Sequence, residues 1–309
     1  MARRPPPPID GVCVVDKPAG WTSHDVVAKA RGLLGTRKVG HSGTLDPDAT
    51  GVLLLGVGRA TRLLRFLTEL PKSYVGEMVL GTTTSTLDAA GEVTGTFAMD
   101  GVTLAAVRAA AAAFVGEIDQ VPPMVSALKV DGRRLHELAR EGIEIERAPR
   151  RVTIGRIDVE STAQAHVFRL SVDCGSGTYI RSLAADIGTA LGGGAHLANL
   201  RRIAAGGFSL AEAKPLTGLE LLGMAEVLRA YPRISVDAEG RGDLIQGRRV
   251  QVPGPGGADR AAPTQPATSG AVAGAYGPDG DLVAAVNWLG DTLVPLVVVA
   301  VVGAASTGE

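Results

Sequence analysis

One aspartate of this chain stands in a loop that suits a catalytic carboxylate. The segment Gly40–Gly51 reads GHSGTLDPDATG and places Asp46 directly before Pro47. Because a proline disfavours the α region for the residue before it, we expect Asp46 to be held extended at the end of a strand. The glycines around it permit close backbone approach. Asp-Pro and Gly-rich pairs are also common in surface turns, so the loop alone leaves that alternative open.

Further motifs surround this loop in a fixed order. They are DKPAGWTS at 16–23, KSY at 72–74, GTTTSTLD at 81–88 and GTYIR at 177–181. Together with GHSGTLDP they make the chain resemble the bacterial TruB-type tRNA pseudouridine synthases, from about Gly11 to Phe208. The resemblance implies a stand-alone enzyme that isomerises uridine 55 in the T arm of tRNA.

The resemblance also implies how three side chains act. Asp46 matches the family's nucleophile, and Arg181 matches the arginine that pairs with it, which a guanidinium can do through two parallel hydrogen bonds. Tyr74 matches the tyrosine that stacks on the target base, and it is also a candidate for the proton acceptor at C5. We therefore expect these three residues to form the catalytic group.

Four further residues are expected to contact the substrate. His41 matches a histidine associated with flipping the uridine out of the T loop. Tyr179 and Leu200 match positions that contact the nucleotide, although core packing is a competing interpretation for both. Lys17, in the DKPAG motif, either touches a phosphate or braces the nucleophile loop, and the sequence does not separate these roles.

The implied reaction breaks the bond between uracil N1 and ribose C1′, turns the base and rejoins it through C5. It needs a nucleophile, a way to hold the detached base and a proton acceptor, but no redox step, metal or activated phosphate. We therefore expect no cofactor, and the other histidines show no convergent metal-ligand spacing. Asp46 could add to C6 of the base or act at C1′, and the sequence leaves both routes open.

Composition and charge limit the class of protein. The net charge is -1 over 309 residues, so any RNA contact must be local rather than the work of a polycationic surface. The two cysteines, Cys13 and Cys174, lie in apolar runs, so we expect core thiols and a reducing cytoplasm. The apolar run Leu293–Val302 is shorter than the roughly 20 residues that a membrane helix needs, and its valines favour a buried strand.

The order of strand and helix patterns predicts an α+β catalytic domain over residues 9–230, with a central mixed or antiparallel sheet. Short apolar runs predict strands at 12–15 and 52–57, and alternating patterns predict strands at 73–80, 152–159 and 167–174. Residues 200–203 are expected to begin a last strand of this domain. Capping residues and helical periodicity predict helices at 25–34, with Ser23 as the cap, and at 60–70, 101–115 and 180–191.

Segments outside that pattern predict RNA-binding modules. Residues 120–151 interrupt it with two prolines and a charged helix, and the resemblance makes them a thumb that grips RNA in an enzyme without guide RNA or obligate protein partner. Residues 231–309 resemble a small PUA-type RNA-binding β-barrel, whose Pro-, Gly- and Ala-rich stretch 253–275 is expected to be a mobile loop. Residues 1–8 are expected to be a disordered Pro-rich tail. The expected form is a monomer that binds the T stem-loop of tRNA.

Two rival functions remain at this stage. One is a tRNA chaperone that folds RNA and merely retains the site. The other is a glycosidase-like hydrolase, which usually needs two carboxylates flanking the scissile bond. Asp48 would have to be the second carboxylate, and a spacing of two residues in one loop makes that geometry unfavourable.

Overall fold

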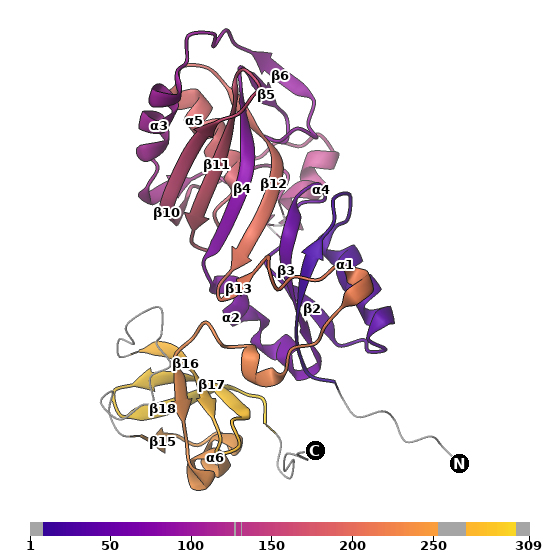
Figure 1. Cartoon of the computed structure of the whole chain (residues 1–309), viewed down its shortest axis with the longest axis vertical. Coiled ribbons are helices and arrows are strands. Elements are labelled where there is room, and N and C mark those ends of the chain that lie inside the picture. The colour runs from indigo at the N-terminus through magenta and orange to yellow at the C-terminus, as the bar shows by residue number, and fades with distance from the viewer. Residues whose placement is uncertain (1–8, 127, 131, 253–269, 301–309) are drawn as a thin grey trace.

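The computed structural model describes residues 9–126, 128–130, 132–252 and 270–300. Its largest element is a nine-stranded sheet in the order β1-β3-β12-β4-β11-β10-β7, with β2 on β3 and β13 on β12 (Figure 1). The strands are β1 Gly11–Lys17, β2 Val39–Ser42, β3 Thr50–Val57, β4 Lys72–Leu80, β7 Gly116–Gln120, β10 Arg150–Ser161, β11 Val167–Cys174, β12 Ala195–Ala205 and β13 Phe208–Ser209. β3 and β12 run parallel and the other paired strands of this sheet are antiparallel, so the sheet, predicted to be mixed or antiparallel, is mixed.

The continuous apolar run of β1 shows how this sheet is buried on both faces. Cys13 and Val15 belong to a core formed with β4, β11 and helices, whereas Val12 and Val14 belong to a second core on the opposite face. Successive side chains of a strand point to opposite faces, so one short apolar run supplies both cores. The predicted core position of both cysteines is confirmed, because Cys13 and Cys174 are buried.

The helices follow the predicted order but not every predicted boundary. They are α1 Ser23–Leu33, α2 Leu64–Glu69, α3 Leu104–Ala112, α4 Leu135–Arg140 and α5 Ile180–Ala190. The cap of α1 is Thr22 rather than Ser23, because Thr22 forms a capping box with Asp25. The predicted helix at 60–70 begins as the 3-10 helix Gly58–Leu63.

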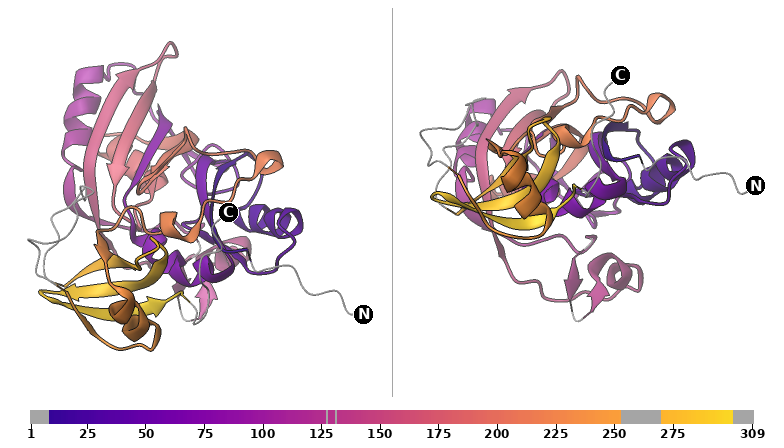
Figure 2. Two further views of the ribbon diagram at one scale, coloured as in Figure 1. Left: turned by 60° about the horizontal axis from the view of Figure 1, so that its bottom comes forward. Right: turned by 90° about the horizontal axis from the view of Figure 1, so that it is seen from below.

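Two small hairpins stand apart from the large sheet. One pairs β5 Thr82–Thr84 with β6 Val93–Thr96, and the other pairs β8 Lys129–Val130 with β9 Arg133–Arg134. The second hairpin and α4 form the predicted insert, which projects from the body in the view from below (Figure 2). Within the described residues, no helix has the length and apolar character to cross a membrane.

A five-stranded sheet forms the C-terminal part. Its order is β14-β16-β17-β18-β15, from β14 Arg233–Ser235, β15 Val250–Gln251, β16 Ala271–Tyr276, β17 Leu282–Leu289 and β18 Thr292–Val298, with α6 Ala238–Ile245 against it. Arg59 and Arg62, near the start of α2, donate hydrogen bonds to the carbonyls of Val299 and Val298. The C-terminal sheet is therefore joined to the catalytic part, and its PUA-type assignment stays a prediction.

One prediction for this part is wrong. The end of the stretch expected to be a mobile loop is strand β16, in which Ala273 and Ala275 are fully buried. Its small residues permit close packing, since a Cβ on Gly274 would lie 2.7 Å from the ring of Tyr276. The expected tail 1–8, the remainder of the expected loop at 253–269, and the end of the expected strand at 301–302 lie outside the described residues.

Candidate active site

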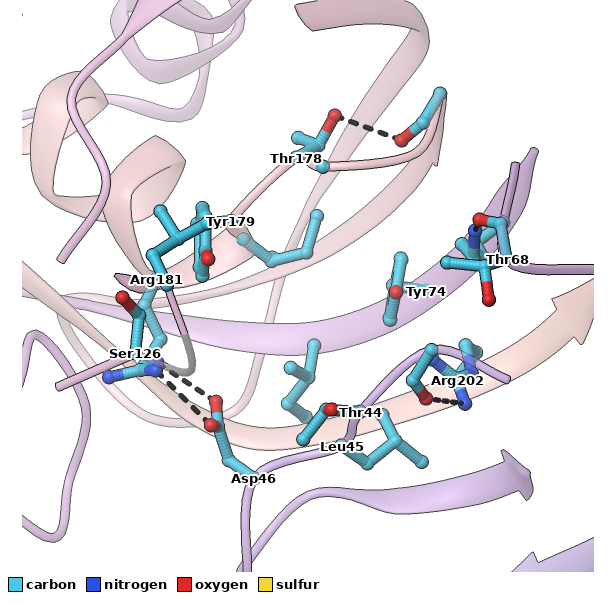
Figure 3. A pocket seen from close by; sticks show the side chains of 17 residues that line it. Thr44, Leu45, Asp46, Thr68, Tyr74, Ser126, Thr178, Tyr179, Arg181 and Arg202 are labelled. Carbon is cyan, nitrogen blue, oxygen red and sulfur yellow. Dashed lines mark hydrogen bonds and ion pairs between the residues drawn. The ribbon is translucent and has the colours of Figure 1, made fainter. Parts of the chain in front are cut away.

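A cavity of about 280 Å³ lies where the nucleophile loop meets β4, β12 and the start of α5. Five of the predicted site residues line it, namely Asp46, Tyr74, Tyr179, Arg181 and Leu200. Figure 3 shows Asp46 and Arg181 on one side of the cavity, Arg202 and Thr68 on the other, and the ring of Tyr74 between them. Segments that are far apart in sequence thus bring the predicted catalytic group together.

Arg181 holds Asp46 through a two-pronged ion pair. Its Nε lies 2.9 Å from Asp46 Oδ2, and its Nη2 donates to Asp46 Oδ1 over 3.2 Å. The guanidinium is only 4% exposed, whereas the carboxylate is 40% exposed toward the cavity. Burial raises the pKa of Asp46, and the charge of Arg181 is the largest opposing effect. The pair orients the carboxylate and favours its ionised form.

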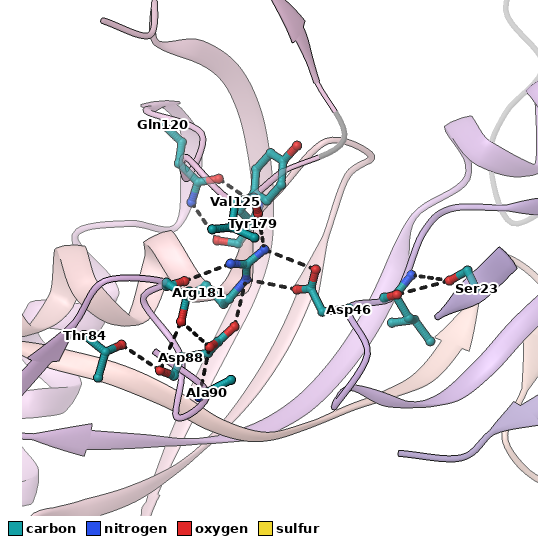
Figure 4. A network of polar contacts seen from close by, with 11 residues as sticks. Ser23, Asp46, Thr84, Asp88, Ala90, Gln120, Val125, Tyr179 and Arg181 are labelled. Atoms are coloured by element: carbon teal, nitrogen blue, oxygen red, sulfur yellow. Dashed lines mark hydrogen bonds and ion pairs between the residues drawn. The ribbon is translucent and has the colours of Figure 1, made fainter. Parts of the chain in front are cut away.

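Asp88, to which no role was assigned from the sequence, also contacts this arginine. Asp88 Oδ2 lies 3.5 Å from Arg181 Nε, and Arg181 Nη1 donates to the carbonyl of Thr86 over 2.8 Å (Figure 4). The Asp88 carboxylate also accepts hydrogen bonds from Thr86 Oγ1 and from the backbone N–H of Ala90. Asp88 is the last residue of the GTTTSTLD motif, so this motif was the sequence signal that could have identified it. Arg181 is thus held by Asp46 on one side and by Asp88 and the Thr86 carbonyl on the other.

The loop that carries Asp46 is irregular, which corrects one prediction. β2 ends at Ser42, so Asp46 follows an irregular segment and does not end a strand. Ser23, at the start of α1, anchors this segment instead, because its Oγ accepts from the N–H of Leu45 and donates to the Leu45 carbonyl. A buried hydroxyl thereby fixes the residue next to Asp46.

Lys17 is fully buried beneath the same loop. Its Nζ donates to the carbonyls of Pro18, Trp21 and Pro47 over 2.9, 2.6 and 2.8 Å. Burial lowers the pKa of Lys17 to about 8. Lys17 is absent from the described residues that line the cavity, and its contacts match the bracing alternative rather than a phosphate contact.

His41 lies on β2 beside the loop, and it too is absent from the described residues that line the cavity. Its ring meets that of His24 edge to face, with centroids 5.1 Å apart. Burial lowers the pKa of His41 to about 4, and the charges of His24 and Arg202 act in the same direction. The ring is therefore neutral near pH 7, and its buried Nδ1 has no hydrogen-bond partner among the described residues.

Two cations, Lys72 and Arg202, line the cavity without having been assigned a role from the sequence. Lys72 Nζ donates to the carbonyls of Thr68 and Leu70, and Arg202 donates to those of Val52 and Gly43. The strand register brings them close to Tyr74, which pairs with Arg202 across β4 and β12. Burial raises the pKa of Tyr74, and the charge of Arg202 is the largest opposing effect.

The start of α5 positions Tyr179 and Arg181. The side chain of Gln120 clamps the backbone of Tyr179, accepting from its N–H over 2.8 Å and donating to its carbonyl over 3.1 Å. The insert also reaches the site, because Ser126 lines the cavity and the carbonyl of Val125 accepts from Arg181 Nη2. Burial raises the pKa of Tyr179. Gln120 acts through a contact between distant segments of the fold, and it belongs to no sequence motif that could have identified it.

Solved structures share the fold. A chain from an archaeal box H/ACA sRNP complex has a TM-score of 0.68 and 25% identity, covering 94% of this chain and 86% of that chain. A chain from an H/ACA RNP bound to a substrate RNA containing 2′-deoxyuridine has a TM-score of 0.70 and 24% identity, covering 94% and 85%. These likenesses show the pseudouridine synthase fold.

Sequence relatives give the family. The chain is 44% identical to tRNA pseudouridine synthase B of Arthrobacter sp. (strain FB24), over 94% of this chain and 97% of that protein. It is 54% identical to tRNA pseudouridine synthase B of Mycobacterium sp. (strain KMS), over 68% of this chain and 71% of that protein. Residues 31–180 match the TruB family pseudouridylate synthase N-terminal domain, and residues 181–231 match the tRNA pseudouridylate synthase B C-terminal domain. The chain therefore belongs to the TruB family of pseudouridylate synthases, and its activity is that of an isomerase.

Proposed function

We propose that this protein converts uridine 55 in the T loop of tRNA to pseudouridine, with Asp46 as the nucleophile and without a guide RNA. The relatives named tRNA pseudouridine synthase B support tRNA as the substrate. The observation that carries the assignment of the nucleophile is the two-pronged ion pair between Asp46 and Arg181 on the wall of the cavity.

The ion pair suits a carboxylate that must attack in one direction. Arg181 is fixed by two backbone carbonyls and by Asp88, so the guanidinium cannot follow the carboxylate if it moves. Holding a nucleophile in its reactive orientation removes part of the entropic barrier. The same geometry serves attack at C6 of the base or at C1′ of the ribose, and both routes belong to the proposal.

Tyr74 supplies the surface against which the base rests. Its ring faces the cavity and is 8% exposed, and stacking on an aromatic ring is worth about 1–3 kcal/mol per base. Because burial raises the pKa of Tyr74, its hydroxyl is neutral near pH 7, and acceptance of the C5 proton depends on the opposing charge of Arg202. Tyr179 and Leu200 complete the wall around the nucleotide.

His41 and the modules outside the large sheet are proposed to handle the RNA. His41, neutral and beside the nucleophile loop, assists flipping of the uridine out of the stack. The insert 120–151 grips the T arm and contributes Ser126 and the carbonyl of Val125 to the site. Residues 231–309 act as a PUA-type RNA-binding module, and the enzyme works as a cytoplasmic monomer.

Of the rival functions, hydrolysis has the weaker support. Asp48 is exposed and is absent from the described residues that line the cavity. The carboxylate of Asp88 is held by Thr86 and Ala90 behind Arg181. Neither acidic group faces Asp46 across the cavity as a second glycosidase carboxylate would.

The test uses unmodified tRNA transcripts and the purified protein alone. Carbodiimide labelling or mass spectrometry should find pseudouridine at position 55 in full-length tRNA and in an isolated T-arm hairpin, with no guide RNA added. An anticodon-arm hairpin is the matched control and should stay unmodified. Tight tRNA binding without pseudouridine in either substrate would favour the chaperone, and free uracil would favour the hydrolase.

A further inference from the structure

Two buried cations form the end of the cavity that lies away from Asp46. Lys72 is 7% exposed and Arg202 is 1% exposed, and both line the cavity beside Thr68 and Gly43. A Cβ on Gly43 would lie 3.3 Å from Arg202 Nη1 and 3.6 Å from Lys72 Cε, so the two side chains converge on this glycine. Figure 3 places this end beyond the ring of Tyr74 as seen from Asp46.

Neither cation has an acidic partner within the described part of the chain. Lys72 and Arg202 take part in none of the ion pairs there, and their hydrogen bonds go to backbone carbonyls and, for Arg202, also to the hydroxyl of Tyr74, which is not acidic near pH 7. Burial, and after it the charge of Arg202, lowers the pKa of Lys72 to about 8. Burying charges without counter-charges is unfavourable. An anion in the cavity would therefore be stabilised strongly at this end.

The proposed reaction creates such an anion in either route. If Asp46 acts at C1′, the electron pair of the N1–C1′ bond leaves with the base, which becomes a uracil anion while the carboxylate becomes a neutral ester or acid. If an oxygen of Asp46 adds to C6, the C5–C6 π pair moves toward C4 and gives an enolate on O4. Negative charge moves from Asp46 to the base in both cases. It returns to the carboxylate when C5 has bonded to C1′ and the bond to Asp46 breaks, and the proton that leaves C5 is replaced by one on N1, which has lost its bond to C1′.

We propose that Lys72 and Arg202 are catalytic residues that stabilise the negative charge which develops on the uracil while it is detached or adducted. The proposal rests on the proposed function. Arg181 compensates the charge while it is on Asp46, and the Lys72–Arg202 pair compensates it once it has moved to the base. Preorganised charges of this kind act on the transition state more than on substrate binding.

The alternative occupant of this end is a phosphate of the RNA backbone. The position of Tyr74 favours the base, because its ring lies between Asp46 and Arg202, where the uracil would stack. A phosphate contact would contribute to tRNA affinity and to its salt dependence, whereas charge stabilisation on the base contributes to the rate at saturation.

The test measures single-turnover pseudouridine formation at saturating tRNA for the wild type, Lys72→Met and Lys72→Arg. We expect Lys72→Met to reduce the rate about 100-fold, in the range seen when one such donor is removed, while tRNA affinity stays within about threefold. Lys72→Arg restores a fixed charge and should recover most of the rate. Circular dichroism checks that each variant is folded.

A substrate with 5-fluorouridine at position 55 separates charge stabilisation from a structural role. Fluorine at C5 withdraws electrons and stabilises an anionic base, so consumption of 5-fluorouridine should suffer less from Lys72→Met than conversion of uridine does. Lys17→Met is the matched control, because that lysine also donates to buried carbonyls but lies outside the cavity lining. The loss of rate caused by Lys17→Met should be equal for uridine and for 5-fluorouridine.

Two results would overturn the proposal. An equal defect of Lys72→Met on uridine and 5-fluorouridine would mean that the lysine is structural. A defect confined to tRNA affinity, with a smaller salt slope, would mean that it binds a phosphate. Failure of the proposed function itself is distinguishable, because the wild type would then form no pseudouridine at position 55.

Discussion

The substitution Lys17→Met separates the two roles considered for this lysine. The ammonium of Lys17 ties Pro18 and Trp21 on one segment to Pro47 in the nucleophile loop. Methionine fills the same space but donates no hydrogen bond. If Lys17 is a brace, the change should destabilise the fold and displace the nucleophile without altering the electrostatics of RNA binding.

The size of the effect follows from the three hydrogen bonds of Lys17. At about 1.5 kcal/mol for each bond from a charged donor, they are worth about 4–5 kcal/mol. The methionine variant regains about 1–2 kcal/mol of this stability, because its folding does not have to transfer a charged ammonium from water to the interior. We therefore expect the free energy of unfolding to fall by about 3 kcal/mol.

The assay is urea unfolding followed by circular dichroism, combined with tRNA binding at several salt concentrations. Lys29→Met is the control, because Lys29 is exposed on α1 and such surface changes are usually within about 0.5 kcal/mol. The slope of log affinity against log salt should match the wild type for Lys17→Met. Wild-type stability together with a slope smaller by about 0.7–0.9, which corresponds to one lost phosphate contact, would refute the brace.

Three further outcomes are expected. Arg181→Lys should lower the single-turnover rate about 100-fold with tRNA affinity within about threefold, because a lysine cannot reproduce the two-pronged contact; an unchanged rate would show that orientation by the guanidinium is unimportant. Gly51→Ala should reduce the free energy of unfolding by more than about 2 kcal/mol, because the φ of Gly51 is +98° and a Cβ there would lie 2.2 Å from the backbone oxygen of Arg202. Gly32→Ala is the control, because a Cβ on this α1 residue meets open space, and it should be neutral or stabilising. His41 should titrate by NMR near pH 4, because burial and then the charge of His24 lower its pKa, and His24→Asn should raise that value; a wild-type midpoint near 6.5 would contradict the buried setting.

Much of the candidate catalytic group could be predicted because its residues sit in contiguous motifs. The loop around Asp46, the tyrosine of KSY and the arginine of GTYIR each have a local signature, and these residues line one cavity. Six strands of the large sheet were predictable because short apolar runs and alternating patterns report burial directly, whereas β2, β7 and β13 were not predicted.

The partners of these residues were not predictable because they depend on strand register. Arg202 reaches the cavity because the β4/β12 ladder shifts register between Ala198 and Arg201 and again between Arg202 and Ala204. Such irregularities change which face a side chain points to, and an alternating pattern does not reveal them. Gln120 belongs to no motif and lies more than fifty residues from Tyr179, so only the folded chain brings the two together. Asp88 stands in a motif, but its contact with Arg181 is likewise visible only in the folded chain.

The identity of the nucleophile is the central claim, and Asp46→Asn tests it most directly. Asparagine keeps the shape of the side chain but removes the charge and the nucleophilic oxygen, and Asp48→Asn makes the same change on an exposed residue of the same loop. With unmodified tRNA and no cofactor, we expect Asp46→Asn to bind tRNA but form no pseudouridine at position 55, while Asp48→Asn remains as active as the wild type. Pseudouridine formation by Asp46→Asn at a rate near that of the wild type would contradict the account.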